Sequence, residues 1–111
     1  MKETVKFEDW KKLDLRIGEI KEVDNHPNAD KLILLKVDIG DKIISLVAGI
    51  KNYYKKEKLI GKKIVVFANL EPSIIRGIKS EGMVLASEDK ESNIVSLLIP
   101  DQDVKNGSVI R

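Results

Sequence analysis

The stretch that decides the fold runs from Lys62 to Ser87 and contains the apolar run Ile64-Val65-Val66-Phe67-Ala68-Asn69-Leu70. The β-branched and aromatic side chains of this run predict a strand over residues 64–70. Pro72 has no N–H group to donate to a sheet ladder, so strand pairing is expected to stop there. We therefore expect a long irregular loop over residues 71–82 and a second strand over residues 83–87.

The predicted loop is longer than most connections in a compact domain, and loops of this length usually have a function. It contains three isoleucines, at positions 74, 75 and 78, whose exposure to water is unfavourable. Polar side chains stand near them at Asn69 and Ser80. We predict that this loop is the working surface of the protein.

Length and composition indicate one soluble globular domain over residues 1–111, because 42% of the residues are hydrophobic and 34% are charged. The absence of cysteine excludes disulfides and thiolate sites and favours an intracellular protein. The N-terminus is charged from Lys2 and Glu3 onward, and no apolar run is long enough to span a bilayer. We expect a cytoplasmic protein without a membrane segment.

A local excess of positive charge stands out against the net charge of +2. Six lysines and a single acid, Glu57, lie between Lys51 and Lys63. Such a run can attract a polyanion, although a solvated lysine face is its commoner meaning.

The other predicted elements come from hydrophobic periodicity, which is close to three residues in a short helix and two in strands. In the first strand this alternation slips by one residue after Gly18, which predicts a β-bulge and a sharp bend. The elements expected, in chain order, are a helix over 7–12, strands over 13–23, 31–39 and 43–48, a helix over 52–60 and a strand over 95–99.

This order of elements predicts an all-β fold: a five-stranded Greek-key barrel of the OB type, with a short helix between strands 3 and 4 and extensions at both ends. The alternative fold is an SH3-like barrel, which usually lacks a helix between its third and fourth strands. OB barrels bind nucleic acid on the outer face of strands 2 and 3 and on the loops after strands 1 and 4. Here those loops are residues 24–30 and 71–82.

Groups for catalysis are scarce in this chain. His26 is the only imidazole, and Gly61-Lys62 lacks the upstream glycine of a phosphate-binding loop. A metal site of His26, Asp24 and Asp30 is conceivable, but a histidine before proline in a turn is more often a hydrogen-bonded loop residue. We expect no enzymatic activity, no metal and no cofactor.

Three side chains near the predicted loop have two interpretations each. Asn69 either closes the loop by hydrogen bonds or contacts a base edge, because its amide both donates and accepts. Ser80 either caps the loop or contacts a ligand. Met83 either fills the core, which the residues favour, or forms an adaptable surface for a base or an apolar partner.

Five separated blocks of the sequence resemble a known family, the tRNA-binding domain at the C-terminus of methionyl-tRNA synthetases. The same domain occurs as free-standing dimeric tRNA-binding proteins and in auxiliary factors of synthetase complexes. The blocks are Leu13-Asp14-Leu15-Arg16-Ile17-Gly18, His26-Pro27-Asn28-Ala29-Asp30-Lys31-Leu32, Ala48-Gly49-Ile50, Asn69-Leu70-Glu71-Pro72 and Arg76-Gly77-Ile78-Lys79-Ser80-Glu81-Gly82-Met83.

This resemblance implies an OB-fold that binds tRNA by shape, since folded RNA offers proteins little sequence information in its grooves. It also implies which side chains face the RNA, with basic ones on its phosphates. The family's RNA-facing positions correspond to Asn69, Ser80 and Met83, with phosphate contacts at Arg16, Lys31, Arg76 and Lys79.

The tail over residues 98–107 resembles instead a sister group, the dimeric CsaA-type secretion chaperones, which bind unfolded chains. Relatives of the tRNA-binding branch usually carry basic residues near Pro72, where this chain has Glu71, Ser73 and Ile74. Two functions therefore remain: a free-standing protein of protein biosynthesis that holds tRNA in trans for methionyl-tRNA synthetase, or a chaperone. A homodimer is expected for both, because residues 94–99 are apolar on both faces of their strand and the segment around Trp10 is apolar too.

Overall fold

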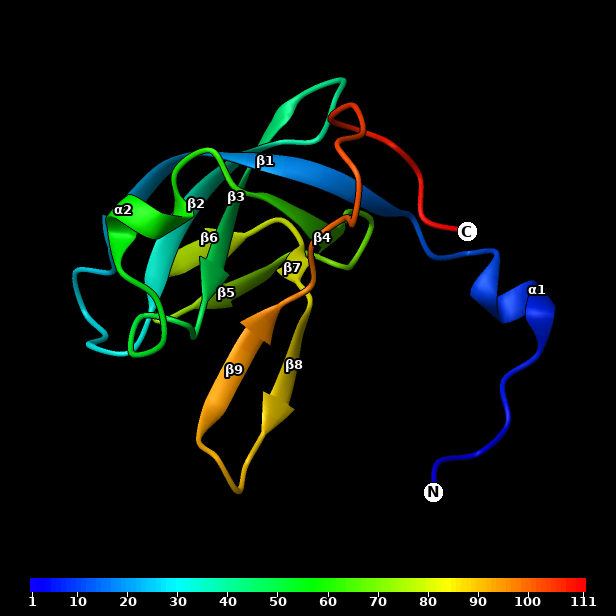
Figure 1. Cartoon of the computed structure of the whole chain (residues 1–111), viewed down its shortest axis with the longest axis horizontal. Coiled ribbons are helices and arrows are strands. Elements are labelled where there is room, and N and C mark those ends of the chain that lie inside the picture. The colour runs from blue at the N-terminus through cyan, green and yellow to red at the C-terminus, as the bar shows by residue number, and fades with distance from the viewer.

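The protein is described over residues 1–111 by a computed structural model, in which strands predominate and both helices are single turns (Figure 1). Neither helix is long and apolar enough to cross a membrane. The predicted all-β class is confirmed. The elements are α1 (Phe7–Trp10), β1 (Leu15–Asn25), β2 (Ile33–Asp38), β3 (Ile43–Ala48), α2 (Lys56–Leu59), β4 (Lys63–Phe67), β5 (Ser73–Ile75), β6 (Ile78–Ser80), β7 (Met83–Val84), β8 (Ala86–Asp89) and β9 (Ile94–Leu97).

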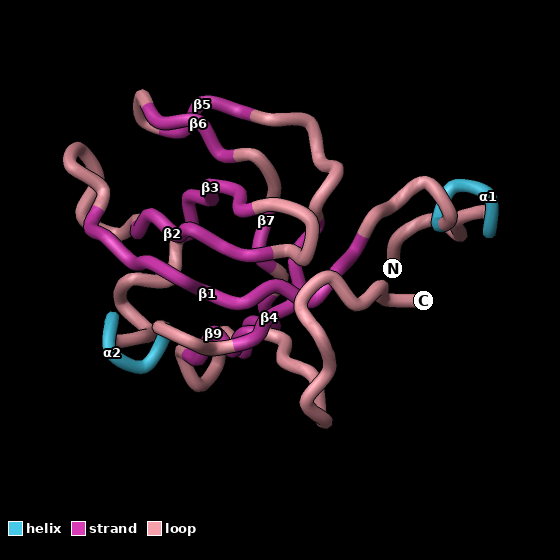
Figure 2. The backbone as a smooth tube through the Cα atoms, turned by 90° about the horizontal axis from the view of Figure 1, so that it is seen from above, coloured by secondary structure: helices cyan, strands magenta, loops and turns pink.

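Five strands form one antiparallel sheet in the order β3-β2-β1-β4-β7, which curls into a nearly closed barrel (Figure 2). Strand β1 is long and bent, and it pairs with β4 through its first half and with β2 through its second half. The register with β2 shifts between Ile20 and Glu22, so the predicted bulge exists but lies beyond Gly18. The predicted five-stranded OB-type barrel, with a short helix between its third and fourth strands, is confirmed.

Gly18 has a packing role instead. A Cβ atom at this position would lie 2.5 Å from Cγ1 of Val37, a fully buried core side chain. The two strands can approach this closely only because residue 18 has no side chain. The core itself comes from the alternate, inward-facing positions of the barrel strands, such as Ile33, Leu35 and Val37 in β2.

The open edge of β3 is joined to the far end of the sheet by residues 80 and 81. The Glu81 N–H donates to the Ser45 carbonyl (2.8 Å), and the Ser45 N–H donates to the Glu81 carboxylate (3.2 Å). The Val47 N–H donates to the Ser80 hydroxyl (3.0 Å), which itself donates to the Gly82 carbonyl (3.0 Å). One main-chain hydrogen bond and two hydrogen bonds to side chains thus take the place of strand pairing and close the barrel.

The segment over residues 71–82 is not an irregular loop, and that prediction was wrong. Strands β5 and β6 pair there as a hairpin across a two-residue turn. The turn residues Arg76 (φ 51°) and Gly77 (φ 89°) both have positive φ, as a type I′ turn requires. Glycine adopts this angle freely, whereas arginine does so rarely, so the sequence carried little sign of the turn.

Several boundaries of strands and helices also differ from the predicted ones. The fourth barrel strand ends at Phe67, not at Leu70, and the strand expected over residues 83–87 divides at Leu85 into β7 and β8. Strands β8 and β9 pair with each other as a separate ribbon that projects from the barrel (Figure 1). Of the helix expected over residues 52–60, only the single turn α2 (Lys56–Leu59) is helical.

The C-terminal residues return along the free edge of the first half of β1. The Ile17 N–H donates to the Ser108 carbonyl (2.9 Å), and the Gly107 N–H donates to the Ile17 carbonyl (2.7 Å). The side-chain amide of Asn106 donates to the Glu19 carboxylate (3.0 Å). This hydrogen bond lowers the pKa of Glu19, and Lys21 beside it lowers that pKa further.

Replacing Ser80 by alanine is expected to lower the free energy of unfolding by about 1–3 kcal/mol, because the buried Val47 N–H loses its acceptor. Urea unfolding followed by circular dichroism measures the change. Ser87→Ala is the matched control, since this serine is exposed and makes no side-chain hydrogen bond. Equal stability of the two variants would contradict a closing role for Ser80.

Glu19→Gln is expected to lower the melting temperature at neutral pH, where the ionised Glu19 carboxylate accepts from Asn106. Because folding lowers the pKa of Glu19, the stabilisation is present above the unfolded-state pKa and is lost as the pH falls through the folded-state pKa. Calorimetry should therefore show the variant and the wild type converging in acid. A difference that stays constant with pH would exclude this origin.

Candidate nucleic-acid interface

The hairpin β5–β6 and the loop between β1 and β2 form one continuous surface, joined by His26. This histidine is 5% exposed, its Nδ1 accepts from the Asn28 N–H (3.0 Å), and its Nε2 lies 3.1 Å from the Ile75 carbonyl. Because Nδ1 accepts, Nε2 carries the proton and donates to Ile75. The Arg76 guanidinium adds a second link by donating to the Asn28 carbonyl (3.1 Å).

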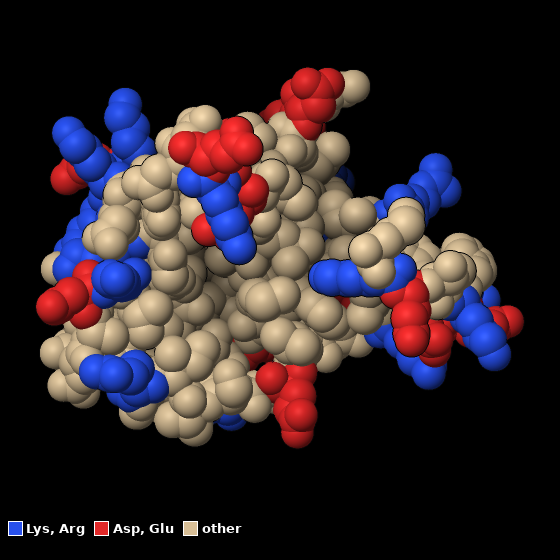
Figure 3. Space-filling model, turned by 90° about the horizontal axis from the view of Figure 1, so that it is seen from below, with Lys and Arg blue, Asp and Glu red and all other residues tan.

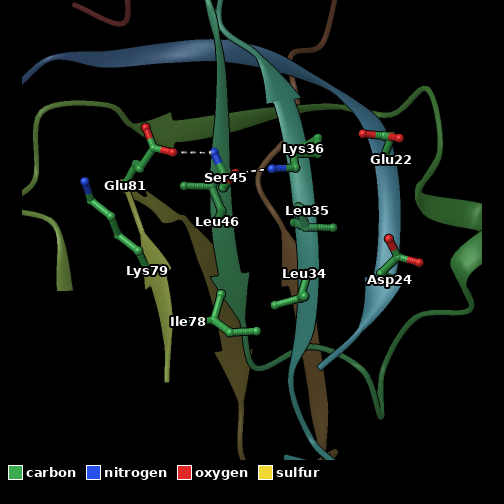
Figure 4. A pocket seen from close by; sticks show the side chains of 10 residues that line it. All are labelled: Glu22, Asp24, Leu34, Leu35, Lys36, Ser45, Leu46, Ile78, Lys79 and Glu81. Atoms are coloured by element: carbon green, nitrogen blue, oxygen red, sulfur yellow. Dashed lines mark hydrogen bonds between the residues drawn. The ribbon is translucent and has the colours of Figure 1, made fainter. Parts of the chain in front are cut away.

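A cavity of about 270 Å³ lies between this hairpin and the outer face of β1, β2 and β3 (Figure 4). It occupies the face of strands 2 and 3 on which OB barrels bind their ligands. Its lining combines apolar, basic and acidic side chains. The lining residues are Glu22, Asp24, Leu34, Leu35, Lys36, Ser45, Leu46, Ile78, Lys79 and Glu81.

Four of the seven predicted RNA-binding side chains are accessible, three of them on the hairpin and the loop between β1 and β2 and one on β7. Lys31 and Lys79 are exposed and form no salt bridge, and Arg76 is exposed at the hairpin turn. Met83 is 42% exposed on β7, so it is not a core residue. These side chains are free to contact a ligand without first breaking an ion pair.

The other three predicted residues make internal contacts. Ser80 is 2% exposed, and its hydroxyl closes the barrel as described above. The Asn69 carbonyl oxygen accepts from the Asp14 N–H (2.7 Å) and its amide donates to the Lys12 carbonyl (2.8 Å), which fixes the N-terminal segment. On local geometry, both residues support the shape of the surface.

Arg16 is held between two carboxylates. Its guanidinium donates to both oxygens of Asp14 (2.9 and 2.8 Å) and to Asp41 (2.9 Å). The hydrogen bond to Asp14 raises the pKa of Arg16, and the charge of Asp41 contributes in the same direction. Its positive charge is therefore largely compensated within the protein.

Basic residues form two groups at opposite ends of the molecule. Figure 3 shows one group of Lys and Arg at its right, the side of α1, where acidic residues are mixed with it, and another at its left, the side on which Figure 1 places α2 and the loop between β1 and β2. Lys55, Lys56 and Lys58 are exposed there, whereas Lys63 pairs with Asp103 (2.8 Å). The lysine run is thus mostly a solvated face, with one member used to hold the C-terminal segment.

The sequence prediction missed most of the cavity lining, including Glu22, Asp24, Leu34 and Lys36. A signal for them exists in the period-two alternation, because the residues between the buried positions of β2 must face outward. Their grouping follows only from the register, which aligns Glu22 with Lys36 and Asp24 with Leu34 across β1 and β2.

Comparisons with known proteins agree with this architecture. A family model described as a putative tRNA-binding domain matches residues 15–109. A methionine–tRNA ligase of Pyrococcus horikoshii is 55% identical over 109 residues, which are 98% of this chain and 15% of that enzyme. The chain thus spans about 15% of the length of the curated relatives it matches first.

Two solved structures are similar over nearly the whole chain. One is an MetRS-related protein from Pyrococcus horikoshii, with a TM-score of 0.90 and 29% identity, covering 99% of this chain and 100% of that chain. The other is a CsaA chaperone protein from Picrophilus torridus, with a TM-score of 0.88 and 36% identity, covering 97% and 100%. The family match and the curated relatives together show that the chain belongs to the family of tRNA-binding domains.

Proposed function

We propose that this protein binds tRNA on the surface formed by the β5–β6 hairpin and the loop between β1 and β2. The observation that carries the proposal is that two segments distant in sequence are fixed together by His26 and present the unpaired cations of Lys31 and Lys79 beside the OB-type binding face. The family is one of tRNA-binding domains, so the role that we propose is non-catalytic.

Phosphate contacts supply most of the affinity in such a complex. Lys31, Arg76 and Lys79 each displace counterions from the RNA backbone, which makes binding salt-dependent. Met83 adds an apolar contact at the end of the barrel. Ser80 contributes by holding the hairpin that carries Arg76 and Lys79 against β3, so that folded RNA of matching shape is preferred over a flexible strand. Asn69 holds the N-terminal segment, and Arg16 is held by Asp14 and Asp41.

We further propose that the protein acts in the cytoplasm as a separate polypeptide that holds tRNA for methionyl-tRNA synthetase. The support is the similarity to methionine–tRNA ligases, in which the matching region is a small part of the enzyme. Two similar solved chains, an MetRS-related protein and a CsaA chaperone protein, are covered over their whole length by this chain. Stimulation of methionyl-tRNA synthetase by the added protein at limiting tRNA tests this role.

Replacing Lys31 or Lys79 by alanine is expected to weaken tRNA binding several-fold at moderate salt. Each change should reduce the slope of log affinity against log salt by about 1, because one phosphate contact is lost. Filter binding with total tRNA over a range of salt concentrations measures both quantities. Lys90→Ala, at the exposed turn between β8 and β9, is the control and should leave them unchanged. A random single strand bound as tightly as tRNA would contradict recognition by shape.

We also propose a homodimer that uses the apolar side chains of the β8–β9 ribbon and of the residues that follow it. Ile94 in β9 is 52% exposed, and Ile99, two residues beyond the end of β9, is 58% exposed. The face toward which the ribbon projects has few charges at its centre (Figure 3). Apolar side chains grouped on a surface favour association with a partner.

The Ile99→Asp variant is expected to be a monomer at micromolar concentration, where light scattering should report a dimer for the wild type. Ile43→Asp is the matched control, because Ile43 is also 58% exposed but lies at the start of β3. This control should remain dimeric. A monomeric wild type would refute the dimer.

A second candidate function is a chaperone for unfolded polypeptides. It is favoured by Ile74, which is 66% exposed on the hairpin, and by the similarity to CsaA chaperones. Suppression of aggregation of an unfolded client, abolished by Ile74→Ser and unaffected by tRNA, would support this function over the first.

A further inference from the structure

We propose that the cavity between the hairpin and the sheet accepts one unpaired guanine base of the bound RNA, with the Glu81 carboxylate accepting the N–H groups of its Watson–Crick edge. This inference rests on the proposed tRNA binding and names what one part of the RNA does there. It concerns Glu81, a residue that none of the proposed phosphate contacts uses.

The charges of the cavity disfavour a phosphate group as its occupant. Its lining residues include three acids, Glu22, Asp24 and Glu81, against two bases, Lys36 and Lys79. The Lys36 ammonium already donates to the Ser45 hydroxyl. An anion inside the cavity would be repelled, whereas a neutral group with N–H donors meets acceptors on both walls.

The floor of the cavity is apolar and suits a flat neutral ring. Leu34 from β2 and Ile78 from the hairpin point toward each other there, and both are half-buried (Figure 4). The cavity volume of about 270 Å³ lies just below the range for small-molecule sites, which begins at about 300 Å³, so the cavity has room for a small ring only. No aromatic side chain lines the cavity, so hydrogen bonds to the base edge must provide the selectivity.

Glu81 is the acceptor with a fixed orientation. Its carboxylate accepts from the Ser45 N–H, which anchors it at the mouth of the hairpin, and three of its lone-pair positions remain free. Guanine presents N1–H and an N2 amino hydrogen side by side, a pair that one carboxylate can accept as it accepts two N–H groups from arginine. Adenine, cytosine and uracil lack two adjacent donors on this edge.

The surrounding cations favour RNA over a basic peptide as the source of these donors. Lys31, Arg76 and Lys79 lie on the two segments that border the cavity, and they attract a polyanion while repelling cationic side chains. The acids inside the cavity then keep phosphates at the rim and leave the interior to a base.

The test compares two variants that are expected to change the tRNA affinity in opposite directions. Removing a negative charge near bound RNA normally strengthens binding, so Glu22→Gln, whose carboxylate makes no hydrogen bond, should raise tRNA affinity slightly. Glu81→Gln removes the same charge and keeps an oxygen for the Ser45 N–H, but it cannot accept two donors. It is therefore expected to lower tRNA affinity about tenfold in fluorescence anisotropy, since a bidentate contact to a base contributes about 1–3 kcal/mol.

A series of tRNAs with one loop guanosine at a time replaced by inosine, which lacks the N2 amino group, tests the base directly in the wild-type protein. One replacement should weaken binding to the wild type about as much as Glu81→Gln does, and should have little further effect on the variant. If Glu81→Gln raises affinity as Glu22→Gln does, or if no inosine has an effect, the guanine site is wrong. If the wild type binds no tRNA but binds a lysine-rich peptide, the proposed function fails as well.

Discussion

The hydrogen bonds of residues 80 and 81 to the open edge of β3 are the interaction on which the rest of the structure depends. A strand edge with unpaired N–H groups is open to water and to other chains. Here the Ser80 hydroxyl and the Glu81 backbone and carboxylate satisfy Ser45 and Val47, without a strand pairing along this edge. Gly82 allows the chain to pass close to β4, because a Cβ atom there would lie 2.6 Å from the Phe67 carbonyl.

This closure also places the binding surface. The hairpin β5–β6 ends at Ser80, so fixing that residue against β3 fixes the hairpin above the sheet and creates the cavity beneath it. His26 then ties the turn end of the hairpin to the neighbouring loop. Lys79 projects from the strand directly before the closing residue. The residue that closes the barrel, Ser80, and a residue proposed to bind RNA, Lys79, are therefore neighbours in the sequence. The buried Ser80 holds the exposed Lys79 in place.

The barrel could be predicted from the sequence because it depends on local pattern. Strand β3 has the predicted bounds, and the bent first strand was visible in a one-residue slip of its alternation. The hairpin turn could not be predicted, since Arg76 gives no signal for positive φ. The tasks of Asn69 and Ser80 depend on partners 55 and 33 residues away, and no local pattern distinguishes an internal hydrogen bond from one to RNA. The cavity could not be predicted either, because its lining residues are brought together only by the register of three strands.

The most direct measurement is the amide NMR spectrum of the uniformly ¹⁵N-labelled protein titrated with tRNA. Chemical shifts should change in residues 26–32 and 73–81 and along the outer face of β2. The Ser45 and Val47 amides should remain protected from hydrogen exchange, because the barrel stays closed on binding. Changes confined to the β8–β9 ribbon or to α2, or loss of protection at Val47, would contradict a preformed RNA surface held by this closure.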